Sequence, residues 1–157
     1  MKRKKTLRIL AILVIAGVLV GGGIGLYMFF MPQRDIQKLP VDHQVTASEL
    51  TAEFLDDIGN ANNKYLAADG ESKILEVTGR VARISENFNG EKVVLLKGEN
   101  DNAGVSCTFM HETNNRVNGL ETGDVVTIKG VIRSGAYYDE DLDMYVNVTV
   151  EKSDLIN

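Results

Sequence analysis

Hydrophobic positions divide the chain into two contrasting parts. No residue from Ile9 to Gln33 carries a charge, and the apolar run from Ile9 to Met31 spans 23 residues. As an α-helix this run would be about 34 Å long at roughly 1.5 Å per residue, enough to cross a hydrocarbon layer of about 30 Å. The pattern predicts a basic cytoplasmic tail over residues 1–8, a transmembrane helix over 9–31, a linker over 32–45 and a folded domain over 46–157.

The ends of the apolar run indicate how it sits in a membrane. Lys2, Arg3, Lys4, Lys5 and Arg8 precede it, and a cationic flank favours a cytoplasmic N-terminus. The run is longer than the apolar region of a cleaved signal peptide, about 7 to 15 residues, so we expect a retained anchor, with a cleaved signal as the alternative. Gly17, Gly21 and Gly25 repeat at every fourth residue, a spacing that lets helices approach closely and would allow a homodimer. The alternative is that glycine is common in membrane helices generally.

A short amphipathic helix is expected where the folded domain begins. Thr46 and Glu49 fit a capping box, in which the two residues satisfy each other's free amide groups. Gly59 and Asn60 are typical of a helix end. A second short turn is expected over residues 61–66. One apolar face at helical spacing would pack on the domain, formed by Leu50, Phe54, Leu55 and Ile58.

Five strand-like segments rich in β-branched residues follow, at residues 73–85, 91–98, 105–110, 124–134 and 144–153. Asn89-Gly90 favours a tight turn between the first two. A longer polar connection, with room for one helical turn, separates the third from the fourth. In the fifth, Tyr145, Asn147 and Thr149 alternate with Val146, Val148 and Val150.

Glycines inside two of these segments indicate the architecture. Gly79 and Gly130 sit among β-formers, where a glycine often marks a bend or a close backbone approach. Strands bent in this way can curl five antiparallel segments into a closed barrel. We therefore predict an all-β fold, a five-stranded OB-fold Greek-key barrel, preceded by the amphipathic helix and the transmembrane helix. An SH3-like barrel or a small sandwich is the alternative. The expected inward-facing residues are Leu75, Val77, Gly79 and Val81 in the first strand, and Val126, Ile128, Gly130 and Ile132 in the fourth.

Charge and cysteine content narrow the function. All 22 acidic residues follow Arg34, but only 11 of the 17 basic residues do, so this part has a net charge of −11. Such a charge disfavours nucleic acid, whose phosphates attract Lys and Arg. Cys107 is the one cysteine, so no internal disulfide forms, and we expect a buried thiol.

Candidate binding residues lie in two loops of the predicted barrel. Phe88 falls between the first two strands, and Tyr137 and Tyr138 between the last two. These loops flank the usual OB-fold binding face, so the aromatic rings could converge on a sugar, a base or a protein partner; plugging the barrel mouth is the alternative. Arg80, Arg83 and Lys129 are the candidate anion contacts on the outer face of the first and fourth strands.

The remaining polar residues do not form a recognisable metal-binding or catalytic motif. Four carboxylates lie at Asp139, Glu140, Asp141 and Asp143; we expect a solvated loop, with calcium binding as the alternative. Neither His43 nor His111 has cysteine or histidine at metal-ligand spacing. We therefore expect no metal, no cofactor and no catalytic site.

The chain resembles the tRNA_anti-like OB-fold family from about residue 49 to residue 155. The likeness lies in NKYLAADGESKILEVTGRVARI, GVSCTF and LETGDVVTIKGVI, through Asn63, Lys64, Tyr65, Val77, Gly79, Cys107, Phe109, Gly123, Asp124, Val126, Lys129 and Gly130. The resemblance implies a bacterial membrane-anchored or lipoprotein-type OB domain. Two departures stand out. Ser153 occupies the place where the family pattern implies a second cysteine, and residues 67–72 look inserted.

These observations favour a non-enzymatic binding module, held in the bacterial cell membrane by a single pass with the domain outside the cytoplasm. The expected ligand is a protein or a carbohydrate-like molecule. A single-stranded nucleic-acid-binding domain and a structural spacer within a membrane complex are the alternatives.

Overall fold

The structure, a computed structural model, describes residues 2–30 and 35–156. The chain divides into two compact units, one up to Arg34 and the other from Asp35 onward. The first unit contains α1 (Lys2–Phe29). Its segment Ile12–Phe29 has a mean hydropathy of 2.3 and is long and apolar enough to cross a membrane. The helix also includes residues 2–8, which the sequence assigned to a separate tail, whereas Met31 lies outside the described residues.

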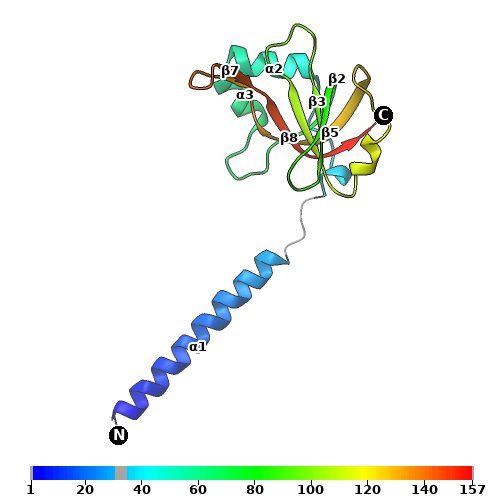
Figure 1. The fold of residues 1–157 in the computed structure, drawn as a ribbon. Helices are drawn as coiled ribbons and strands as arrows, with labels where there is room; N and C mark the ends of the chain where they lie inside the picture. Colours follow the sequence, from blue (N-terminus) through cyan, green and yellow to red (C-terminus); the bar gives the residue numbers. More distant parts are fainter. Residues whose placement is uncertain (1, 31–34, 157) are drawn as a thin grey trace. The chain divides into compact units, whose positions relative to one another are not determined.

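A closed barrel of five strands forms the centre of the second unit (Figure 1). Its neighbouring strands follow the order β2-β3-β4-β8-β5, and β5 pairs with β2 to close the ring. The predicted OB-fold barrel is therefore confirmed. The expectation of antiparallel strands throughout was wrong in one place, because β4 and β8 pair in parallel. The barrel strands are β2 (Ile74–Glu86), β3 (Lys92–Leu96), β4 (Val105–Phe109), β5 (Val125–Ser134) and β8 (Val148–Leu155).

The long strands β2 and β5 pair with each other and so close the barrel. The first half of β2 pairs with β5, and its second half pairs with β3 from Val81 onward, with a register shift between Val81 and Arg83. A Cβ on Gly130 would lie 2.5 Å from Cγ1 of Val150, so the glycine lets β8 cross β5 at close range. A Cβ on Gly79 would likewise lie 2.9 Å from Cβ of Ala47. Both glycines mark close backbone approaches, as their position in the strands predicted.

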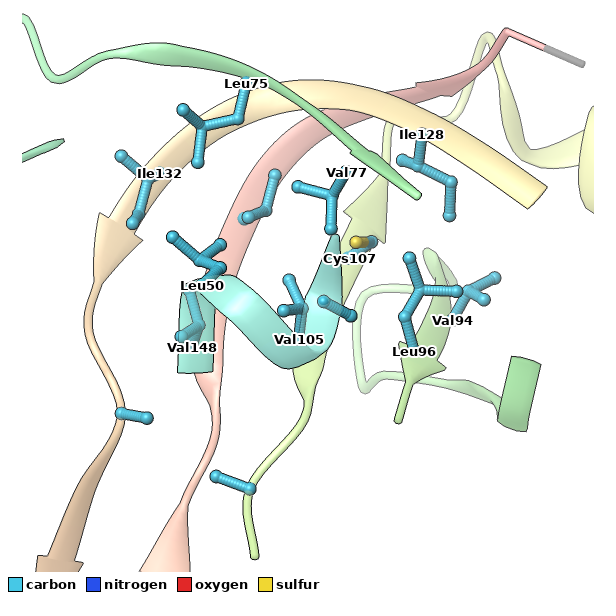
Figure 2. Close-up of a cluster of buried hydrophobic side chains, with 14 of the residues drawn as sticks. Leu50, Leu75, Val77, Val94, Leu96, Val105, Cys107, Ile128, Ile132 and Val148 are labelled. Carbon is cyan, nitrogen blue, oxygen red and sulfur yellow. The ribbon is translucent and has the colours of Figure 1, made fainter. Parts of the chain in front are cut away.

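The barrel interior is filled by aliphatic side chains from every strand and from a helix (Figure 2). Leu75 and Val77 of β2 and Ile128 and Ile132 of β5 are fully buried, which confirms the two predicted inward faces. Cys107 is also fully buried, and this burial raises the pKa of its thiol to about 12. The thiol thus belongs to the core, as expected for a lone cysteine.

Two short helices precede the barrel, where the sequence predicted one helix followed by a turn. In α2 (Ala47–Asp56) the capping box is present: Glu49 N donates to Thr46 Oγ1 at 3.2 Å, and Thr46 N donates to the Glu49 carboxylate at 3.0 Å. The chain then breaks at Asp57, whose side chain caps α3 (Ile58–Tyr65). The predicted stop at Gly59 was therefore wrong, and so was the buried position of Ile58, which begins α3 and is 48% exposed.

Residues 35–45 belong to the second unit, although the sequence placed them in a linker; residues 32–34 of that linker lie outside the described residues. The 3-10 helix η1 (Ile36–Lys38) places Ile36 against Ile74 and Val131 on the outside of the barrel. Strand β1 (His43–Thr46) then pairs in parallel with β2. The sequence did not reveal this because two apolar residues, Ile36 and Leu39, form too short a pattern to indicate packing.

The predicted fifth strand is two strands. Met144–Val146 forms β7, which pairs with β6 (Tyr137–Asp139) in a hairpin outside the barrel. The chain leaves the hairpin at Asn147, whose side chain accepts a 2.9 Å hydrogen bond from Gly104 N, and β8 begins one residue later. The 3-10 helix η2 (Asn114–Val117) supplies the helical turn for which the polar connection had room.

Candidate functional site

The β6–β7 hairpin carries three half-exposed tyrosines. Tyr138 lies directly across the hairpin from Tyr145, and their ring centroids are 5.0 Å apart. Tyr137 pairs with Val146 in the same ladder. The tyrosine side chains are 43%, 44% and 38% exposed at positions 137, 138 and 145. Three large rings thus remain partly open to solvent on an element that adds nothing to the closure of the barrel.

These rings line one wall of an open hollow of about 390 Å³, which we call the tyrosine pocket. The hairpin lies beside α2 and α3 at one end of the barrel (Figure 1). The helices supply the opposite wall, and the loop between β3 and β4 adds one side chain. Besides Tyr137, Tyr138 and Tyr145, the pocket is lined by Phe54, Leu55, Asp56, Ile58 and Asn102.

A close backbone approach fixes the floor of the tyrosine pocket. Phe54 is 1% exposed, and a Cβ on Gly135 would lie 2.1 Å from its ring carbon Cδ1. Gly135 therefore lets the chain entering the hairpin pass directly against the Phe54 ring. The capping box at the start of α2 and this glycine together position the two walls of the pocket.

The acidic turn of the hairpin is tied to one of the tyrosines. The hydroxyl of Tyr138 donates to the Asp143 carboxylate, and this hydrogen bond raises the pKa of Tyr138. Asp139 Oδ1 accepts hydrogen bonds from the amides of Asp141 and Leu142, at 3.0 and 3.1 Å. Two of the four carboxylates therefore shape the turn or the pocket wall. No group of three or more histidine, cysteine, aspartate or glutamate side chains in residues 2–30 and 35–156 is arranged to hold a metal ion.

Phe88 does not join the tyrosines. It is fully exposed in the turn between β2 and β3, whereas Asn102, which lines the tyrosine pocket, lies in the loop that follows β3. The five residues of β3 separate the two, about 16 Å at roughly 3.3 Å per residue. The sequence placed all three aromatic residues at one mouth, but the structure brings together only the tyrosines.

The three candidate anion contacts are also separated. Lys129 is 8% exposed, because η1 covers it, and its ammonium group donates to the carbonyls of Gln37 and Leu39 at 3.0 and 2.7 Å. Arg80 donates to the Gly123 carbonyl at 2.9 Å. Arg83 is exposed beyond the register shift in β2. Lys129 is therefore not accessible to an anion, and Arg80, Arg83 and Lys129 do not form one cluster.

Part of the tyrosine pocket escaped the sequence analysis. Tyr145 was assigned to the fifth strand, and Leu55 and Ile58 to a buried helix face. A short acidic turn between two β-forming pairs, Tyr137-Tyr138 and Met144-Tyr145, is the signal that would have indicated the hairpin. No local pattern could have shown that the hairpin folds against α2.

The family description tRNA_anti-like matches residues 1–140. The chain belongs to the tRNA_anti-like family. This assignment confirms the resemblance carried by the strand glycines and by the residues that precede β2. The OB-fold of this family is generally a non-enzymatic binding domain. No curated protein matches the sequence.

Several residues that carry the resemblance have structural roles in this tRNA_anti-like chain. Lys64 bonds Glu53 at 2.8 Å, and the Tyr65 hydroxyl donates to the same carboxylate at 3.0 Å. Tyr65 is fully buried beside Phe54, with ring centroids 5.8 Å apart. Lys64 and Tyr65 therefore join α3 to α2 behind the tyrosine pocket. Ser153, at the place of the implied second cysteine, is fully buried beside β4.

Proposed function

We propose that this protein is a non-enzymatic binding module, anchored in the membrane by α1, which presents the tyrosine pocket outside the cytoplasm to a protein or a carbohydrate-like ligand. One observation carries the proposal: three half-exposed tyrosine rings line a single hollow beside an otherwise closed barrel. Apolar hollows with few polar groups are the usual form of a ligand site. Tyrosine suits binding surfaces because its ring packs on apolar groups while its hydroxyl stays hydrated.

Charge supports a ligand other than nucleic acid. The chain after Arg34 carries 22 acidic and 11 basic residues, and the charged side chain that lines the tyrosine pocket is Asp56. Contacts to phosphate oxygens require donors such as Arg and Lys. Of the two arginines predicted to contact anions, Arg80 already donates to a backbone carbonyl.

Two features of α1 support the proposed location outside the cytoplasm. The helix is long and apolar enough to span a membrane, and the cationic residues at its start favour a cytoplasmic N-terminus. We further propose that Gly17, Gly21 and Gly25 allow two copies of α1 to associate. A Cβ added at any of the three meets no other atom of the chain within 4 Å.

The test compares ligand binding by matched variants of the full chain in lipid nanodiscs. The protein is applied at low salt to arrays of peptides, glycans and single-stranded oligonucleotides. We expect peptide or glycan spots that are lost in the double variant Tyr137→Ser, Tyr145→Ser and kept in Phe88→Ser, which removes an exposed ring far from the pocket. Equal binding of both variants to the same spots would contradict the tyrosine pocket as the binding site. Tight, salt-sensitive binding to oligonucleotides would contradict a protein or carbohydrate-like ligand.

A further inference from the structure

The tyrosine pocket presents aromatic rings to whatever enters it. Tyr138 and Tyr145 are inclined at 59° to each other at a centroid distance of 5.0 Å, and Tyr137 lines the same hollow. The face of an aromatic ring carries negative electrostatic potential and attracts a cation within about 6 Å of its centroid. Several rings around one hollow therefore favour a positively charged group over a neutral one.

Carboxylates lie in the pocket lining and in the turn of the hairpin. Asp56 is part of the pocket lining, and the turn of the same hairpin holds Asp139, Glu140, Asp141 and Asp143. The bond from the Tyr138 hydroxyl to Asp143 places a carboxylate at the edge of one ring. One positive group lies close to the lining, because the ammonium group of Lys97 donates to the Asn102 carbonyl at 3.2 Å.

The number of carboxylates indicates the kind of cation. One ammonium or guanidinium group would occupy the pocket and meet Asp56. The three exposed acidic residues of the turn, Glu140, Asp141 and Asp143, belong to the same hairpin but not to the pocket lining. They would then meet further positive charges, which a basic peptide segment supplies and a single small cation does not. Complementary charge of this kind speeds association and selects the partner.

We propose that the tyrosine pocket binds a lysine or arginine side chain from a basic segment of a partner protein. The tyrosine faces hold the cationic group, and the carboxylates of Asp56 and the hairpin turn hold that group and its basic neighbours. This inference rests on the proposed function and narrows its ligand to a positively charged polypeptide.

The experiment uses the full chain in nanodiscs of neutral lipid and a fluorescein-labelled nonapeptide of three glycine–serine–arginine repeats. The control peptide carries citrulline, the neutral isostere of arginine, in place of each arginine. We expect saturable binding of the arginine peptide with a dissociation constant of about 1 mM or tighter. The citrulline peptide should bind at least about tenfold more weakly, since two rings at about 0.5–1 kcal/mol each correspond to that factor.

Variants of the pocket separate the aromatic faces from general attraction by an acidic surface. Tyr138→Leu with Tyr145→Leu keeps apolar bulk but removes the rings, and should weaken the arginine peptide about tenfold. Tyr138→Phe with Tyr145→Phe keeps the rings and should retain binding within about threefold. Phe88→Leu removes an exposed ring at the other end of β3 and should bind like the unchanged protein. Circular dichroism spectra of all variants check that each is folded.

Each other result overturns the inference. Equal binding of the arginine and citrulline peptides would show that the positive charge is not recognised. Unchanged binding by the leucine variant would show that the tyrosine rings do not hold the peptide. No binding of either peptide overturns it as well. The proposed function is judged separately, because array spots that depend on Tyr137 and Tyr145 would keep the pocket as a binding site even when the cationic ligand fails.

Discussion

At the scale of single residues, Gly135 determines whether the tyrosine pocket can form. Its backbone lies against the Phe54 ring, at a distance that leaves no room for a Cβ. Phe54 is in turn packed against Tyr65. A side chain at position 135 must therefore displace a ring that supports both the core and the pocket floor.

We predict that Gly135→Ala lowers the free energy of unfolding by about 1–3 kcal/mol, the usual range for overpacking a close-packed site. Gly119→Ala is the matched control, because a Cβ there meets no atom within 4 Å. Urea denaturation of the two variants gives the comparison. A Gly135→Ala protein as stable as the control would show that Phe54 is not held against this part of the backbone.

The buried thiol of Cys107 makes the stability of the fold depend on pH. Its pKa of about 12 in the folded protein lies above the ordinary value of 9.0 that the unfolded chain would show. The folded state therefore keeps its proton where the unfolded state loses it, so this contribution to stability is complete below about pH 9 and falls as pH rises toward 12. Three pKa units correspond to about 4 kcal/mol.

The prediction is a loss of stability between about pH 9 and 12 that is larger in the natural protein than in Cys107→Ala, which lacks the titrating thiol. Denaturation midpoints measured across this range test it. Parallel pH profiles for both proteins would contradict the burial of the thiol. The same burial predicts that native Cys107 resists alkylation and reacts fully after unfolding.

At the scale of elements, the sequence was most informative where a pattern was long. The 23-residue apolar run was sufficient to predict a long apolar helix. The two glycine-bearing strands were sufficient to predict the barrel, because repeated burial leaves a repeated pattern. Ile36 and Leu39 are too few to make such a pattern, and their burial depends on contact with the outer face of β2 and β5. Part of the tyrosine pocket was missed for a related reason, because α2, which supplies the wall opposite the hairpin, is distant from it in sequence.

The segment before β1 gives the prediction at this scale. Ile36 is 3% exposed against Ile74 and Val131, so Ile36→Ala should lower the free energy of unfolding by about 2–4 kcal/mol. Val125→Ala, on the same face of β5 but 65% exposed, should change it by less than about 0.5 kcal/mol. Thermal or urea unfolding of both variants measures the difference. Equal stability of the two variants would indicate that residues 35–42 act only as a linker.

At the scale of the whole molecule, a helix long and apolar enough to cross a membrane and a barrel domain belong to one chain whose charges are unevenly divided. All acidic residues follow Arg34, and the pocket proposed as the binding site lies in this acidic part. The barrel closes through β2 and β5, whereas the hairpin and the two helices form the pocket beside it. The proposed binding site is therefore built by elements outside the barrel strands.

Photo-cross-linking in intact cells tests the central claim most directly. Tyr137 or Phe88 of the full chain is replaced by p-benzoylphenylalanine, which reacts with groups in contact with it when irradiated. The account predicts a defined adduct from position 137, its loss when Tyr138 and Tyr145 are changed to leucine, and no matching adduct from position 88. The absence of an adduct at position 137, or the same adduct from both positions, would contradict it.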